Sequence, residues 1–164
     1  MKVLFITRKY PPRVGGMEKY SYQLIKHFPG QKEVISLGRS QLHLLWFLPY
    51  ALVKGLFVAR QVDLVYLCDG LLAPIGYLIK KITKVSVMAG VMGLDVMYDS
   101  FIYQNINVRC LKHLDKLVVI SRATVDECTK RSVPSEKCVF IPVGIETGAK
   151  ELYKKASTKD DLEK

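Results

Sequence analysis

The sequence predicts an α/β fold built on a doubly wound parallel sheet of about six strands. Short apolar runs recur along the 164 residues, and most are followed by a segment with helical periodicity. The short runs suit strands that are buried on both faces, as the strands of parallel sheets are. Strands that alternate with helices imply right-handed crossovers, which place helices on both faces of one sheet.

Each expected element follows from its own residue pattern. The first strand is the run VLFI, and the first helix carries apolar residues at three- and four-residue spacing. Ser121 is placed to cap the last helix, because a serine hydroxyl accepts hydrogen bonds from free backbone N–H groups there. We expect strands at 3–6, 32–37, 63–67, 84–89, 116–120 and 138–141, and helices at 17–28, 71–81, 100–113 and 122–131.

The loop after the first strand has the chemistry of an anion site. Pro11 and Pro12 delay the helix, and Gly15 and Gly16 let a ligand come close to the backbone. The helix that follows offers unpaired N–H groups to a phosphate or diphosphate. A tight turn that needs glycine only for its conformation is the alternative. The loop lacks the G-x-G-x-x-G of dinucleotide sites, and the chain lacks a P-loop.

Five segments in order carry a resemblance to a known family. Residues 11–18 match P-P-x-x-G-G-x-E, residues 63–66 match a D-h-h-h strand, and Gly93-Leu94-Asp95 is similar to H-G-x-D. Residues 119–121 are similar to V-I-S, and residues 141–146 to I-P-N-G-V-D. These patterns resemble the N-terminal domain of the GT-B glycosyltransferases of the large retaining family 4.

The resemblance implies a Rossmann-like, acceptor-side domain at residues 1–147, and a linker or the start of a C-terminal donor-binding domain at 148–164. It implies a nucleotide sugar as donor substrate, a sugar or lipid-linked acceptor, and no metal or other cofactor. The glycine loop would approach the donor diphosphate. Asp69 and Asp95 also follow the third and fourth predicted strands, where ligand-side carboxylates belong. Together, the resemblance and this placement give the expected substrate-binding residues Gly15, Gly16, Arg13, Glu18, Gly93, Asp95, Asp69 and Ser121. No catalytic residue is assigned.

Structural roles compete with these assignments. Asp95 can bind an acceptor hydroxyl or cap backbone N–H groups in its loop. Glu18 can face the site or complement the helix N-terminus, and Arg13 and Arg122 can be surface charges. The three histidines fall on predicted helices and are expected to be structural or solvated.

Three departures from the family pattern raise an alternative function. Met92 stands where the family pattern H-G-x-D has histidine, and Val143 stands where the pattern I-P-N-G-V-D has asparagine. Only one strand fits between the first helix and the apolar block, where relatives often have two. The alternative is a non-catalytic subunit that anchors a separate catalytic chain at a membrane.

Composition and charge limit the kinds of binding partner and the cellular compartment that we expect. The formal net charge is +10, but the basic residues are spread out and lack interleaved stacking aromatics, which disfavours nucleic acid. The four cysteines show no C-x-x-C spacing, so we expect reduced thiols in a cytoplasmic protein. The chain enters a strand at once, which predicts no signal peptide.

The apolar block at 42–59 has two interpretations. It is a helix packed on the sheet, or a helix whose apolar face dips into an anionic membrane surface, with lysines and arginines nearby. Pro49 and Lys54 interrupt it, and a membrane span needs about 20 apolar residues. The second interpretation places the protein at the inner face of the membrane.

Overall fold

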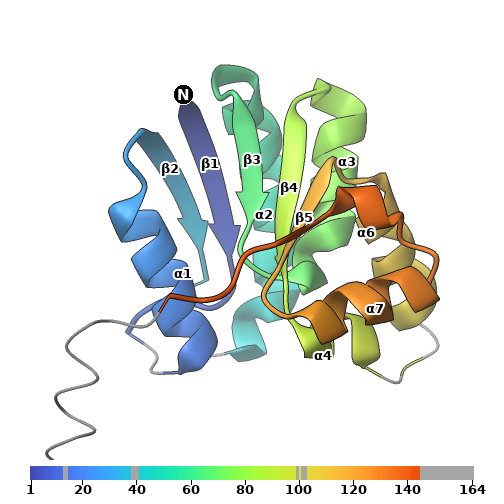
Figure 1. Cartoon of the computed structure of the whole chain (residues 1–164). Coiled ribbons are helices and arrows are strands. Elements are labelled where there is room, and N and C mark those ends of the chain that lie inside the picture. The colour runs from blue at the N-terminus through green and yellow to red at the C-terminus, as the bar shows by residue number, and fades with distance from the viewer. Residues whose placement is uncertain (13–14, 38–40, 99, 101–102, 145–164) are drawn as a thin grey trace, which may run out of the picture.

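A computed structural model describes residues 1–12, 15–37, 41–98, 100 and 103–144. Its centre is a parallel sheet of six strands in the order β2-β1-β3-β4-β5-β6 (Figure 1). The strands are β1 (Lys2–Thr7), β2 (Gln31–Ser36), β3 (Leu64–Leu67), β4 (Ser86–Val91), β5 (Lys116–Val119) and β6 (Cys138–Phe140). The predicted fold class and sheet type are confirmed.

Helices connect the strands. They are α1 (Gly16–His27), α2 (Leu44–Val58), α3 (Ala73–Thr83), α4 (Gly93–Met97), α6 (Arg109–His113) and α7 (Arg122–Lys130). A one-turn 3-10 segment, Gln41–His43, precedes α2, and a π-helical segment, Gln104–Val108, precedes α6. Helices α2 and α3 cover one face of the sheet, and α1 lies on the other (Figure 1).

Alternation along β1 shows how the two faces are filled. Leu4 and Ile6 point to the α2–α3 side, and Val3 and Phe5 point to the α1 side. All four are almost fully buried. The continuous apolar run in the sequence is therefore a strand covered on both faces, as predicted.

Three predicted elements needed correction. Lys84, expected in a strand, ends α3 in the left-handed conformation with φ 63°, and β4 runs on through Gly90 and Val91. The expected helix at 100–113 contains a π-helical turn and starts after Ser100. The short helix α4 was expected as a loop.

The apolar block forms one helix after a short 3-10 turn, with Pro49 inside it. In the part of the chain that the structure describes, no helix has the length and apolar character needed to cross a membrane. The expected boundary between residues 147 and 148 lies outside the described residues.

Candidate functional site

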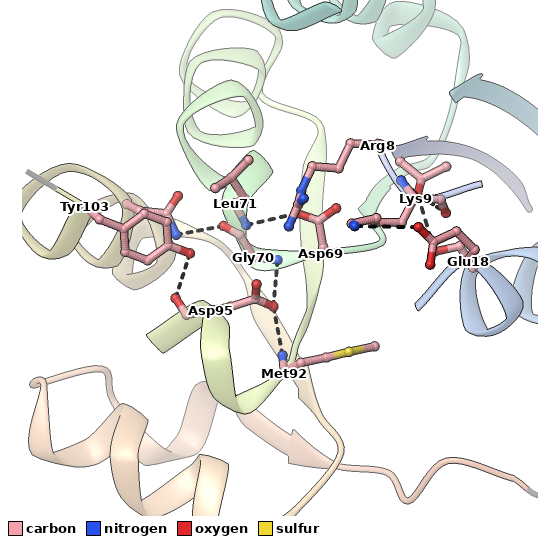
Figure 2. Close-up of polar contacts among 12 residues, drawn as sticks. Arg8, Lys9, Glu18, Asp69, Gly70, Leu71, Met92, Asp95 and Tyr103 are labelled. Carbon is pink, nitrogen blue, oxygen red and sulfur yellow. Dashed lines mark hydrogen bonds and ion pairs between the residues drawn. The ribbon is translucent and has the colours of Figure 1, made fainter. Parts of the chain in front are cut away.

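The strand order places a topological switch point between the ends of β1 and β3. The chain leaves β1 toward β2 on one side, and later crosses to β3 on the other side. The loops after β1 and β3 therefore diverge, and open α/β sheets bind ligands at such a point. Arg8 and Lys9 follow β1, and Asp69 follows β3 (Figure 2).

Arg8 and Asp69 form an ion pair across this switch point. Nε of Arg8 donates to Oδ1 of Asp69 at 3.1 Å, and the backbone N–H of Leu71 donates to the same oxygen at 3.1 Å. The Asp69 side chain is 1% exposed, and that of Arg8 is 14% exposed. Asp69 thus holds the guanidinium at the switch point and has little surface left for a substrate.

Burial dominates the acid–base behaviour of Asp69. It raises the pKa of this carboxyl from 3.8 to about 6; Arg8 opposes the rise, and the nearby Asp95 adds to it. Oδ2 of Asp69 is buried and has no hydrogen-bond partner among the described residues. Arg8 is therefore the main group that favours the ionised form of Asp69 over the protonated form.

This pKa shift predicts a pH dependence of stability. Because the folded state holds the Asp69 proton more tightly than the unfolded state, Asp69 favours folding below about pH 4, and this contribution is lost as the pH rises to about 6. The loss amounts to about 3 kcal/mol. We expect Asp69→Asn to flatten the profile of unfolding free energy between pH 4 and pH 7. Urea titrations at several pH values measure the unfolding free energy, and Asp126→Asn, at an exposed position, is the control. If the unfolding free energy changes with pH equally in wild type and in Asp69→Asn, Asp69 is not the group responsible.

Asp95 ties the loops after β3 and β4 together (Figure 2). Its Oδ2 accepts from the backbone N–H of Gly70 at 3.2 Å and of Met92 at 2.9 Å. A Cβ on Gly70 would lie 2.7 Å from Cβ of Asp95, so this close approach needs glycine. Asp95 therefore caps loop N–H groups, which is one of the two roles that the sequence left open.

Two further side chains complete this network. The hydroxyl of Tyr103 donates to the carbonyl of Asp95 at 2.9 Å, and Nδ2 of Asn107 donates to the carbonyl of Gly70 at 2.9 Å. Both come from the segment predicted as a plain helix, and residue spacing there does not indicate a role at the site.

The sequence analysis did not select Arg8 and Lys9. Their position could have indicated a site role, because cations directly after a buried strand lie at the ligand edge.

The glycine loop is open at one glycine only. Gly15 caps α1 in an extended conformation, and the carboxylate of Glu18 folds back over the place where a Cβ would stand. Glu18 also pairs with Lys9 at 3.5 Å. A Cβ on Gly16 would meet nothing within 4 Å. The carboxylate of Glu18 therefore occupies the space beside Gly15, and Gly16 is the position with open space beside it.

Ser121 and Gly93 lie next to one another through Thr124. The Ser121 hydroxyl oxygen accepts from the Thr124 N–H at 3.1 Å, so the predicted cap of α7 is confirmed. A Cβ on Gly93 would be 3.9 Å from Oγ1 of Thr124.

Arg13 lies outside the described residues. Arg122 is exposed, His113 stacks near Tyr77, and Nδ1 of His27 lies 3.0 Å from the carbonyl of Gln23.

Loss of the Ser121 cap has a measurable cost. We expect Ser121→Ala to lower the free energy of unfolding by about 1 kcal/mol, because one N–H at the start of α7 loses its acceptor. Denaturant unfolding measures this. Ser86→Ala, at an exposed strand position, serves as the control and should change stability much less; a cost at Ser121 no larger than at Ser86 would rule out the cap.

No cluster of three or more metal-ligating side chains occurs among the residues that the structure describes. A surface hollow beside α7 is lined by Met97, Gln104, Glu127, Lys130 and Arg131, none of which was predicted as a site residue. The candidate site is thus a polar edge centred on Arg8, Asp69, Asp95 and Gly16.

Comparison with solved structures gives the class of fold. The apo form of the lipopolysaccharide outer core galactosyltransferase WaaB matches with a TM-score of 0.64 and 15% identity, over 90% of this chain and 47% of that one. Anabaena Alr3699/HepE in complex with UDP and glucose matches with a TM-score of 0.64 and 16% identity, over 89% and 45%. The fold is therefore a Rossmann-like half of the GT-B architecture.

A third neighbour has a different activity on the same fold. The UDP-GlcNAc 2-epimerase from Neisseria meningitidis, bound to UDP-GlcNAc, matches with a TM-score of 0.59 and 15% identity, over 85% of this chain and 45% of that one. The chain spans about half the length of these structures. No protein-family profile and no curated protein sequence matches it.

Proposed function

We propose that the chain is the acceptor-side half of a retaining glycosyltransferase of family 4 that takes sugar from a nucleotide sugar. The observation that carries the proposal is the topological switch point at the ends of β1 and β3, where Asp69 fixes the Arg8 guanidinium and where Gly16 has open space beside it. The neighbours named above include a galactosyltransferase and a protein crystallised with UDP and glucose, which supports a nucleotide-sugar donor.

The chain's own residues have distinct parts in this scheme. The donor diphosphate approaches the first turn of α1 at Gly16, where backbone N–H groups favour an anion. Arg8 is held in place by Asp69, so its charge is pre-oriented toward the diphosphate that departs. Asp95 keeps the β3 and β4 loops at a fixed separation, and thereby shapes the pocket for a glycan or lipid-linked acceptor. A second domain supplies most of the donor contacts, and no metal or other cofactor takes part.

Turnover by the native protein tests this proposal. The protein is isolated from its own cells with any chain that co-purifies, and is incubated with a panel of nucleotide sugars and a membrane lipid extract. We expect release of a nucleoside diphosphate and a gain of one sugar on an acceptor. If the nucleotide is released together with an epimerised free sugar, the protein has epimerase activity and is not a glycosyltransferase. If the folded protein neither binds nor turns over any nucleotide sugar, the proposal is rejected.

Met92 favours a second candidate, a non-catalytic subunit that holds a catalytic chain. Its thioether stands at the start of α4, where the family pattern has histidine, and a thioether is a weak hydrogen-bond acceptor. In the same assay this candidate predicts that turnover requires the co-purified chain and survives Gly16→Leu in this one, a change that fills open space beside α1.

A further inference from the structure

The outward face of α2 is apolar along its whole length. A surface helix normally presents polar side chains to solvent, but here Leu45, Trp46, Tyr50, Val53 and Phe57 are exposed. Trp46 is 78% exposed and Phe57 is 68% exposed. At 1.5 Å per residue, the 15 residues of α2 extend for about 22 Å.

The neighbouring helix continues this surface. Helix α2 packs against α3, whose Leu78 and Ile82 are also exposed. We call this set the α2–α3 face, made of Leu45, Trp46, Tyr50, Val53, Phe57, Leu78 and Ile82. An exposed apolar surface of this kind marks an interaction site.

The charges on and around the α2–α3 face are predominantly basic. From residue 41 to residue 94 the basic residues are Lys54, Arg60, Lys80, Lys81 and Lys84, and the acidic residues are Asp63 and Asp69. Asp69 is buried against Arg8. Lys54 lies beside Tyr50, with Nζ 3.2 Å from its hydroxyl and 5.6 Å from its ring centroid. Lys80 is paired with Asp115 at 2.7 Å, and Asp63 is exposed, so the rim of the face is basic on balance.

This charge pattern favours a membrane over a second copy of the chain as the partner of the α2–α3 face. A second copy docked through the same face would place like charges opposite one another, because a two-fold interface brings the same surface together. A domain at the ligand edge would cover the first turn of α2, whereas the apolar face continues to Phe57 at the other end of the helix. A bilayer with anionic headgroups meets both the apolar stripe and the basic rim.

We propose that the α2–α3 face binds an anionic membrane surface, with Trp46, Val53 and Phe57 in the headgroup–acyl boundary and Lys54 and Lys81 at lipid phosphates. This inference stands independently of sugar transfer. It orients the molecule, because the sheet face covered by α2 and α3 turns toward the bilayer and the strands run along the membrane surface. A lipid-linked acceptor would then reach the ends of β1 and β3 from the side.

Trp46 supplies a direct probe, because it is the sole tryptophan of the chain. The 164-residue chain is mixed with vesicles of phosphatidylcholine alone, or of phosphatidylcholine with phosphatidylglycerol. We expect the Trp46 emission to move to shorter wavelength, and to be quenched by brominated lipid, only with the anionic vesicles. Unchanged emission from folded protein at saturating anionic lipid would overturn the proposal, as would a shift that depends on protein concentration without lipid, which indicates self-association.

Flotation with the same vesicles tests the residues. Lys54→Gln with Lys81→Gln should weaken partitioning by roughly fivefold per lysine, and Trp46→Ser with Phe57→Ser should abolish it. The matched control is Tyr22→Ser with Lys26→Gln on α1, where Lys26 lies 5.7 Å from the Tyr22 ring centroid in a similar pair on the opposite face. If this control weakens flotation as much as the α2–α3 variants, general basic charge explains binding and the proposed face is wrong.

Discussion

Replacement of Asp95 by alanine is expected to lower the free energy of unfolding by roughly 3–5 kcal/mol. Two backbone N–H groups, of Gly70 and Met92, lose the same carboxylate oxygen, and hydrogen bonds to a charged acceptor contribute about 1.5–3 kcal/mol each. The loops after β3 and β4 then lose the contact that joins them. Guanidinium titrations with matched m-values measure the change.

A conservative variant separates the hydrogen bonds from the charge. Both N–H groups of Gly70 and Met92 donate to Oδ2 of Asp95, so the carbonyl oxygen of Asp95→Asn can accept both with its two lone pairs. We expect Asp95→Asn to cost less than half as much as Asp95→Ala. Asp126→Ala, at an exposed position on α7, controls for loss of a carboxylate. A cost below about 1 kcal/mol for Asp95→Ala would show that Asp95 does not hold the loops.

Replacement of Arg8 by alanine is expected to destabilise the fold in a pH-dependent manner. Removal of one partner of a buried ion pair costs about 3–5 kcal/mol when the remaining charge has no other compensation. At pH 8 Asp69 is ionised, because its pKa is about 6, so the full cost applies. At pH 5 Asp69 is largely protonated in the folded state, and the cost falls to about that of one hydrogen bond, roughly 1 kcal/mol.

Unfolding free energies of wild type and Arg8→Ala at pH 5 and pH 8 measure this difference. Arg122→Ala is the matched control, since Arg122 is an exposed arginine at the start of α7. The double variant Arg8→Ala with Asp69→Asn should recover much of the stability lost at pH 8, because no buried charge remains. A loss in Arg8→Ala that is equal at the two pH values would mean that Asp69 is not the reason for it.

The fold could be predicted from the sequence because its signals are local. Apolar runs such as Val3–Ile6 define strands covered on both faces, and the serine before α7 defines a cap. The order of strands and helices then leaves few topologies. The left-handed end of α3 at Lys84 was missed, because glycine or asparagine usually occupies such a position.

The places of Asp69 and Asp95 in the fold could be predicted, but their contacts could not. Asp69 and Asp95 were expected at the ligand edge because they follow strands, and the structure places them there. Their hydrogen bonds to Arg8, Gly70 and Met92 depend on which loops meet in space, which spacing along the chain does not encode. The cover that Glu18 gives Gly15 is likewise a contact made by the folded turn of α1.

Mapping of nucleotide-sugar binding on the 164-residue chain tests the central claim most directly. A panel of nucleoside diphosphate sugars is titrated against the isotope-labelled chain, and amide chemical shifts are followed. We expect shifts at Arg8 and Gly16, and at least tenfold weaker binding by Gly16→Leu, since the space beside Gly16 is open and its filling obstructs the ligand, not the fold. Lys26→Leu, at the other end of α1, should bind like wild type. A folded chain whose amide signals do not move at millimolar ligand, or move only away from the ends of β1 and β3, would contradict it.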